Sequence, residues 1–123
     1  MPIHNLSVAV VEDDESVRKA LGRLLSAAGY RVALFESAEA FLADDSRPAC
    51  LVLDVKLPGI SGLELERRLR VLDVRIPILF VTAMGDDTMR QVVQRTGRPC
   101  LPKPIDDRIF LEAIARVIGI RCA

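Results

Sequence analysis

The stretch LVLDVKLPG, residues 51–59, places one acidic residue, Asp54, at the end of a short apolar run. The run is followed almost at once by the turn residues Pro58 and Gly59, so it predicts a buried strand that ends at Asp54. An ionised carboxylate is costly to remove from water, and a buried strand end must therefore supply a partner for it. The neighbours of Asp54 in the fold have to explain how this carboxylate stays charged.

The composition of the 123-residue chain predicts one globular domain over residues 1–123. Half of the residues are hydrophobic, and 17 Lys and Arg balance 17 Asp and Glu. This balance argues against a nucleic-acid-binding surface, and no apolar run approaches the ~20 residues of a membrane span. We therefore expect a cytoplasmic domain that binds neither nucleic acid nor membrane.

The cysteines Cys50, Cys100 and Cys122 are odd in number and lack the C-x-x-C spacing. They predict neither a disulfide framework nor a zinc site, which fits a reducing compartment. We interpret them as ordinary thiols and the single histidine, His4, as a surface residue.

Apolar strand-like runs alternate with helical segments along the whole chain. The five predicted strands lie at residues 6–11, 30–35, 51–54, 76–81 and 100–101. The segments with helical spacing of apolar residues lie at 17–28, 37–42, 61–72, 89–93 and 110–117. Apolar strands joined by helices predict a doubly wound α/β domain, in which a parallel sheet is covered on both faces. Right-handed crossovers then bring every strand-to-helix turn to one edge of the sheet.

The third predicted helix carries the clearest local signals. Ser61 and Glu64 have the S-x-x-E spacing of a capping box at its start. Glu64 with Arg68, and Glu66 with Arg70, are spaced to pair on its outer side.

Polar residues end or follow four of the five predicted strands. They are Glu12 and Asp13 after the first, Asp54 on the third, Thr82 after the fourth and Lys103 after the fifth. In a doubly wound sheet these positions share the edge where ligands bind. Carboxylates gathered there repel one another unless a cation joins them, and oxygen ligands suit Mg²⁺. With a lysine and a hydroxyl beside it, such a site predicts phosphoryl transfer to an aspartate.

The sequence resembles the receiver domain of bacterial two-component response regulators. The resemblance covers residues 8–117 and rests on four motifs: VVEDDESVRKAL at 10–21, LVLDVKLPGISGLEL at 51–65, ILFVTA at 78–83 and LPKPID at 101–106. It implies a flavodoxin-like sheet with strand order 2-1-3-4-5, a single receiver domain and no output domain in this chain. SAEAFL at 37–42 and the second motif look most like receivers that precede a helix-turn-helix transcription module, as in nitrogen-fixation-type regulators.

The resemblance also implies a partner and a cofactor. Asp54 corresponds to the phosphoacceptor, which takes a phosphoryl group from a sensor histidine kinase or a phosphotransfer protein. Asp13 corresponds to a direct Mg²⁺ ligand, Glu12 to a ligand acting through water, and Lys56 to a ligand through its backbone carbonyl. The implied function is a switch that phosphorylates and dephosphorylates itself, and not an enzyme acting on an external substrate.

The remaining implied roles concern the response to phosphorylation. Thr82 and Lys103 correspond to the residues that contact phosphoryl oxygens, and Pro104 to a cis proline. The family usually has Tyr or Phe where this chain has Cys100, and Pro102 removes a backbone donor from the fifth strand. We therefore expect altered switching through the fourth helix, fifth strand and last helix, the surface that would also form a homodimer.

Three other functions stay open on the sequence. A Mg²⁺-dependent phosphatase uses a D-x-D motif, but Lys56 stands where its second aspartate would be. A degenerate receiver that only binds proteins is favoured by Cys100 and opposed by the intact polar residues. A flavin-binding domain shares the fold, but the acidic turn at 12–15 would repel its phosphate.

Overall fold

The computed structural model describes residues 6–83 and 85–119, so Cys122 and His4 lie outside the described residues. Strands and helices alternate along the chain, as predicted. The strands are β1 (Ser7–Val11), β2 (Arg31–Phe35), β3 (Cys50–Asp54), β4 (Ile78–Thr82) and β5 (Cys100–Pro102). The helices are α1 (Glu15–Ala27), α2 (Ala38–Leu42), α3 (Gly62–Val71), α4 (Asp87–Gln94) and α5 (Asp107–Ile118).

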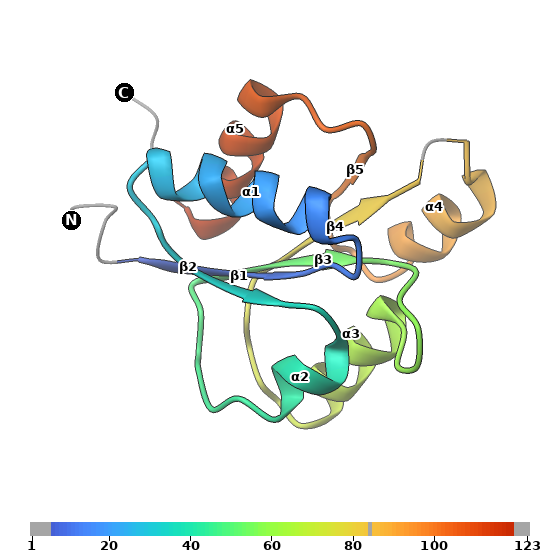
Figure 1. Cartoon of the computed structure of the whole chain (residues 1–123). Helices are drawn as coiled ribbons and strands as arrows, with labels where there is room; N and C mark the ends of the chain where they lie inside the picture. Colours follow the sequence, from blue (N-terminus) through green and yellow to red (C-terminus); the bar gives the residue numbers. More distant parts are fainter. Residues whose placement is uncertain (1–5, 84, 120–123) are drawn as a thin grey trace.

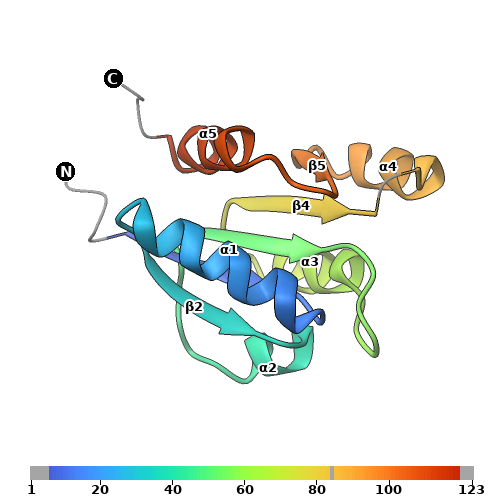
Figure 2. The same cartoon turned by 45° about the horizontal axis from the view of Figure 1, so that its top comes forward.

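The five strands form one parallel sheet in the order β2-β1-β3-β4-β5. Helices α1 and α5 cover one face, and α2 and α3 cover the other (Figures 1 and 2). The predicted doubly wound fold and its strand order are therefore confirmed. No helix of the described part is long and apolar enough to cross a bilayer.

The two faces of the sheet have separate hydrophobic cores, because successive strand residues point to opposite sides. Val8 and Val10 of β1 pack with residues of α1 and α5, whereas Ala9 and Val11 pack with residues of α2, α3 and α4. Both sets are buried, which explains why the central strands are apolar throughout.

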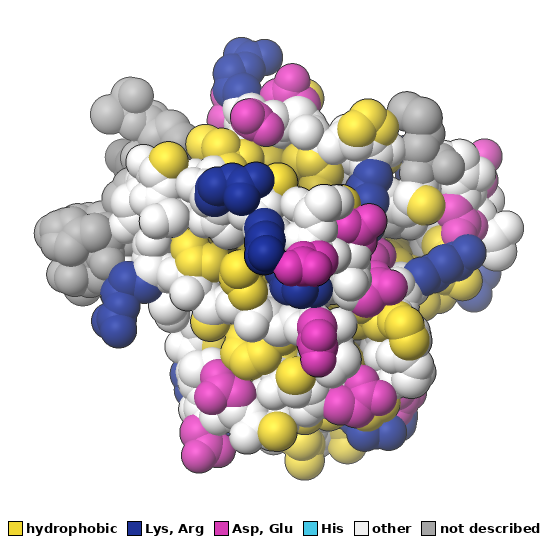
Figure 3. All heavy atoms as spheres, viewed as in Figure 1, with side chains coloured by type: hydrophobic (Ala, Val, Ile, Leu, Met, Phe, Trp, Pro, Cys, Tyr) yellow, Lys and Arg dark blue, Asp and Glu magenta, His cyan; other side chains and the backbone are white. Residues whose placement is uncertain are grey.

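The surface has no single charge character on the face viewed in Figure 3. Acidic and basic side chains are interspersed there, with hydrophobic atoms between them. This matches the equal numbers of acidic and basic residues in the chain.

The start of α3 confirms the predicted capping signal. Ser61 is the N-cap, and its hydroxyl accepts a hydrogen bond from the backbone N–H of Glu64 at 3.1 Å. Glu64 in turn forms an ion pair with Arg68 at 2.9 Å, as its spacing predicts. The Glu64 side chain is thus held by the outer side of its own helix.

Glu66 differs from the prediction. It pairs with Arg70 at 3.4 Å, but it is buried, with 2% of its surface exposed, and does not lie on the outer side. Arg98, from the segment before β5, forms a second ion pair with the same carboxylate oxygen at 3.5 Å. Helical spacing predicted the local pair but not the arginine that comes from another element.

The region formed by α4 and β5 is thinly packed. Val93 is the buried residue of α4, and none of the three β5 residues is buried. Pro102 lies within β5 opposite Thr82, which an edge strand tolerates. The peptide bond between Lys103 and Pro104 is cis, the isomer that the resemblance implied.

Candidate metal centre at the sheet edge

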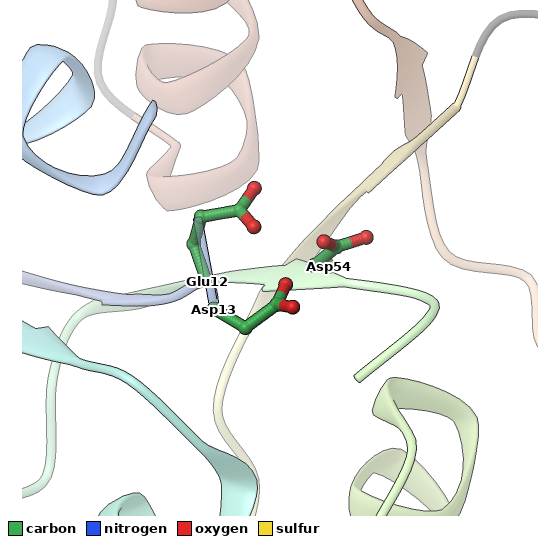
Figure 4. Close-up of side chains that lie close together, drawn as sticks. All are labelled: Glu12, Asp13 and Asp54. Carbon is green, nitrogen blue, oxygen red and sulfur yellow. The ribbon is translucent and has the colours of Figure 1, made fainter. Parts of the chain in front are cut away.

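Three carboxylates meet at the carboxyl ends of β1 and β3. Glu12 and Asp13 directly follow β1, and Asp54 is the last residue of β3. Val11 lies opposite Leu53 in the paired strands, so the residues that follow them are brought side by side. One carboxylate oxygen from each acidic residue lies within 4.8 Å of the others. Figure 4 shows the three side chains close together at this edge of the sheet.

Two of the three carboxylates in this cluster are largely removed from water. Glu12 and Asp54 are buried, with 1% and 6% of their surfaces exposed, whereas Asp13 is exposed. Partial desolvation and then the adjacent Glu12 carboxyl raise the pKa of Asp13 above its ordinary value. A raised pKa of an exposed aspartate indicates a site that favours an added positive charge.

Lys103 supplies one such charge. Its ammonium Nζ lies 2.6 Å from Glu12 Oε1, an ion pair without good hydrogen-bond geometry, and 3.2 Å from Asp54 Oδ2. Burial alone would lower the pKa of Lys103, but the two carboxylates raise it overall, so Lys103 stays charged.

The donor set fits a divalent cation. Three carboxylates and one ammonium leave a net formal charge of −2, and the three side chains offer only oxygen ligands. Hard cations such as Mg²⁺ prefer oxygen ligands of this kind. The arrangement can therefore hold a magnesium ion beside Asp54.

Backbone hydrogen bonds fix the residues around Asp54. The Lys56 N–H donates to Asp54 Oδ1 at 3.3 Å, and the Lys103 N–H donates to the Thr82 carbonyl at 2.7 Å. Thr82 ends β4 and is buried, next to the end of β3. The structure thus brings together Glu12, Asp13, Asp54, Lys56, Thr82 and Lys103, all named from the sequence.

Two residues of the site were missed by the sequence reasoning. A side chain at Gly62 would collide with the carbonyl oxygen of Asp54, so the first turn of α3 can approach the strand end only with glycine. Asp86 forms an ion pair with Lys56, at 2.8 Å between Oδ2 and Nζ. Gly62 follows the N-cap Ser61 within a motif, but that position alone does not reveal the close approach.

Cys100 does not join the cluster. It is half-buried at the start of β5 and packs against the core on the α3 and α4 side of the sheet. Burial raises the pKa of its thiol, with a smaller opposing effect of Arg90, so the thiol stays protonated near neutral pH.

Comparison with known proteins identifies the family to which this fold belongs. A family model described as the response regulator receiver domain matches residues 8–115. The chain belongs to the response regulator receiver domain family. The acidic cluster of this receiver domain lies wholly within the matched residues.

The sequence of this domain is similar to those of a transcriptional regulatory protein and of a response regulator protein. It is 40% identical over 113 residues to the transcriptional regulatory protein FixJ of Rhizobium meliloti, covering 89% of this chain and 55% of that protein. It is 39% identical over 116 residues to the response regulator protein TmoT of Ectopseudomonas mendocina, covering 92% and 53%. The chain therefore spans about half the length of the curated relatives that it matches.

Solved structures agree with these relatives. The crystal structure of FixJ-N superposes with a TM-score of 0.86 at 38% identity, covering 96% of this chain and 97% of that chain. Full-length FixJ from B. japonicum gives 0.84 at 34% identity, covering 93% and 58%. This chain is thus a receiver domain related to those of transcriptional regulators.

Proposed function

We propose that this receiver domain accepts a phosphoryl group on Asp54 from a sensor histidine kinase or a phosphotransfer protein, with Mg²⁺ as cofactor. The observation that carries the proposal is the cluster of Glu12, Asp13 and Asp54 with the Lys103 ammonium among them. Family membership supports the type of reaction, and the cluster supports the choice of residues.

Four groups would hold the cation: the carboxylates of Glu12 (through water), Asp13 and Asp54, and the backbone carbonyl of Lys56. Bound Mg²⁺ supplies positive charge that neutralises the carboxylates and the phosphoryl oxygens. The burial of Glu12 supports its role, because a buried carboxylate needs a nearby positive charge.

Asp54 is the nucleophile of the proposed reaction. One of its carboxylate oxygens attacks the phosphorus of a phosphohistidine, and the P–O bond forms as the P–N bond breaks. The electron pair of the broken bond stays on the donor's imidazole nitrogen, which takes up a proton. Lys103, 3.2 Å from Asp54 Oδ2, is placed to neutralise a phosphoryl oxygen, and the Thr82 hydroxyl donates a hydrogen bond to another.

Water, and not an external substrate, removes the phosphoryl group from Asp54 in the proposed cycle. Water attacks the phosphorus, the bond to the Asp54 oxygen breaks, the carboxylate is restored, and inorganic phosphate is released. The rival phosphatase needs a second carboxyl group as proton donor two residues after the nucleophile. Lys56 occupies that position with its ammonium bound to Asp86, which favours a self-resetting switch.

An apolar groove beside Lys103 supports a protein as the phosphoryl donor. It has a volume of about 350 Å³ and lies between α1 and the segment before α5, lined in part by Val17, Leu21, Leu24 and Ile105. A groove of this kind suits the apolar side of a partner helix. A donor histidine bound there would lie near Lys103.

A second groove supports the output surface. It has a volume of about 600 Å³ beside β5 and α5, and its lining includes Cys100, Leu101, Ala113 and Val117. We propose that phosphorylation promotes a homodimer through α4, β5 and α5, within a regulator of transcription whose DNA is bound by another domain. Free Cys50 and Cys100 support the cytoplasm as its compartment.

One experiment tests the phosphoacceptor. Wild-type protein is incubated with Mg²⁺ and acetyl phosphate, and intact mass spectrometry should detect one added phosphoryl group. Asp54→Asn should remain unlabelled, and Asp13→Asn should need far more Mg²⁺. Asp14→Asn is the matched control, because Asp14 lies outside the cluster and Asn also caps a helix. An unlabelled wild type, or equal labelling of Asp54→Asn, contradicts the proposal.

A further inference from the structure

An ion pair joins the loop after Asp54 to the beginning of α4. Lys56 Nζ lies 2.8 Å from Asp86 Oδ2. Asp86 is the N-cap of α4, and its other carboxylate oxygen accepts a hydrogen bond from the Met89 N–H at 3.2 Å. One carboxylate therefore both begins the helix and binds a lysine from the loop next to the phosphoacceptor.

Lys56 is connected to Asp54 as well. Its backbone N–H donates to Asp54 Oδ1 at 3.3 Å, so the lysine side chain starts beside the carboxylate. That side chain is 67% exposed, and the side chain of Asp86 is 21% exposed. Water screens such a pair, so Lys56 can exchange partners, and its flexible stem lets the ammonium move between neighbouring anions.

Phosphorylation would place a stronger competitor beside Lys56. A phosphorylated hydroxyl side chain carries about −1.5 to −2 charge near neutral pH, and a phosphorylated aspartate is comparable, against the single charge of Asp86. We propose that Lys56 and Asp86 form a latch that is closed in the unphosphorylated domain and opens when a phosphoryl group on Asp54 draws the Lys56 ammonium away. This inference rests on the proposed function.

The latch acts on an element that is weakly held. Val93 is the buried residue of the eight-residue α4, so few apolar contacts anchor the helix. Elements with few buried contacts open at low free-energy cost. Loss of the ion pair at the first turn should therefore loosen α4. This response would not need the aromatic residue that the family usually has in place of Cys100.

Two substitutions open the latch from opposite ends. Lys56→Met removes the ammonium but keeps the backbone N–H that binds Asp54 and the carbonyl proposed to bind Mg²⁺. Asp86→Asn removes the charge but keeps the cap, because Asn caps helices as well as Asp does. Asp87→Asn is the matched control, since Asp87 is an exposed acidic neighbour whose nearest ion pair, with Arg90, is 3.8 Å long.

The measurement is amide hydrogen exchange in peptides that cover α4, with the phosphoryl content of each sample read from its intact mass. Without phosphorylation, both latch variants should exchange about 1.4- to fivefold faster than wild type, the range for an exposed ion pair. The Asp87→Asn control should match wild type. Wild type labelled by acetyl phosphate and Mg²⁺ should show a similar acceleration, and the double variant should exchange no faster than either single variant.

Three results overturn the latch. The first is that α4 exchanges at the wild-type rate in both unphosphorylated variants. The second is that the effects of the two substitutions on this rate add in the double variant. The third is that phosphorylation of wild type leaves the rate in α4 unchanged. A wild type that takes up no phosphoryl mass overturns the proposed function together with the opening step. The unphosphorylated samples still measure the effect of the Lys56–Asp86 ion pair on α4. Failure of the ion pair can therefore be distinguished from failure of the proposed function.

Discussion

The edge that carries the carboxylates is closely packed, whereas the region of α4 and β5 is thinly packed. All residues of β3, and four of the five in β1, are buried, whereas α4 contributes one buried residue and β5 none. Transfer of a phosphoryl group requires fixed positions for the reacting groups. A conformational response requires an element that can move at low cost. The phosphoryl transfer and the conformational response proposed above would therefore use adjacent but separate parts of the molecule.

The largest expected effect is at Gly62. An alanine there would collide with the Asp54 carbonyl, so Gly62→Ala should lower the free energy of unfolding by about 3 kcal/mol in urea denaturation. Gly97, between α4 and β5, has a positive φ of 76° but open space around it, and Gly97→Ala should cost about 1 kcal/mol. If the two substitutions lowered the free energy of unfolding equally, the contrast between a crowded region at Gly62 and an open region at Gly97 would be wrong.

A smaller effect is expected at Lys103. Lys103→Met leaves Glu12 and Asp54 buried without their ammonium, which should cost about 2 kcal/mol in a chelator, after allowance for partial solvent exposure. Added Mg²⁺ should restore part of this stability. Lys19→Met, which removes an exposed partner of Glu15, is the control and should change stability by less than about 0.5 kcal/mol. If the two variants behave alike, the cluster does not depend on Lys103.

Substitution of Cys100 tests whether the conformational response can change while phosphorylation of Asp54 does not. Cys100→Tyr introduces the family's usual kind of side chain beside an apolar groove. We expect less than a twofold change in the rate of Asp54 labelling, but a clear change in α4 hydrogen exchange and in dimer formation by light scattering. Cys100→Ala controls for loss of the thiol. A change confined to the labelling rate would contradict our account of this departure.

The smallest effect is expected on the outer side of α3, away from both regions. Hydrogen bonds from Arg67 and Arg68 lower the pKa of Glu64 to about 2, from an ordinary value of 4.5. Because the folded-state pKa is depressed, the stabilisation is complete above pH 4.5 and is lost as the pH falls toward 2. The Tm of Glu64→Gln should therefore lie slightly below that of wild type at neutral pH, and the difference should shrink between pH 4.5 and 2. A constant difference across this range would show that the carboxylate charge has no part in it.

Local patterns in the sequence predicted much of the fold. The alternation of apolar runs and helical segments predicted each strand and helix that the described residues form, and Ser61 began α3 as its spacing indicated. The strand order came from the resemblance to receiver domains, because periodicity does not specify which strands are neighbours. The polar residues at the strand ends then followed from the geometry of parallel sheets.

Contacts between distant segments could not be predicted in this way. Arg98 forms an ion pair with Glu66 from another element, and Asp86 forms one with Lys56. Gly62 allows the backbone of α3 to approach the carbonyl of Asp54. Each contact depends on how elements pack, and no periodic pattern encodes it. The pairing of Lys103 with both Glu12 and Asp54 likewise appears only when the ends of β1, β3 and β5 are in place.

The position of β5 at the border of the sheet has a consequence for how such proteins diversify. β5 is three residues long and pairs with β4 alone, whereas β3 is enclosed between β1 and β4. A substitution in β5 therefore disturbs the pairing with one strand, and it reaches Asp54 only through Lys103, the residue that follows β5. The side chains of this border strand can therefore vary between receiver domains while β1 and β3 keep the acidic cluster in place.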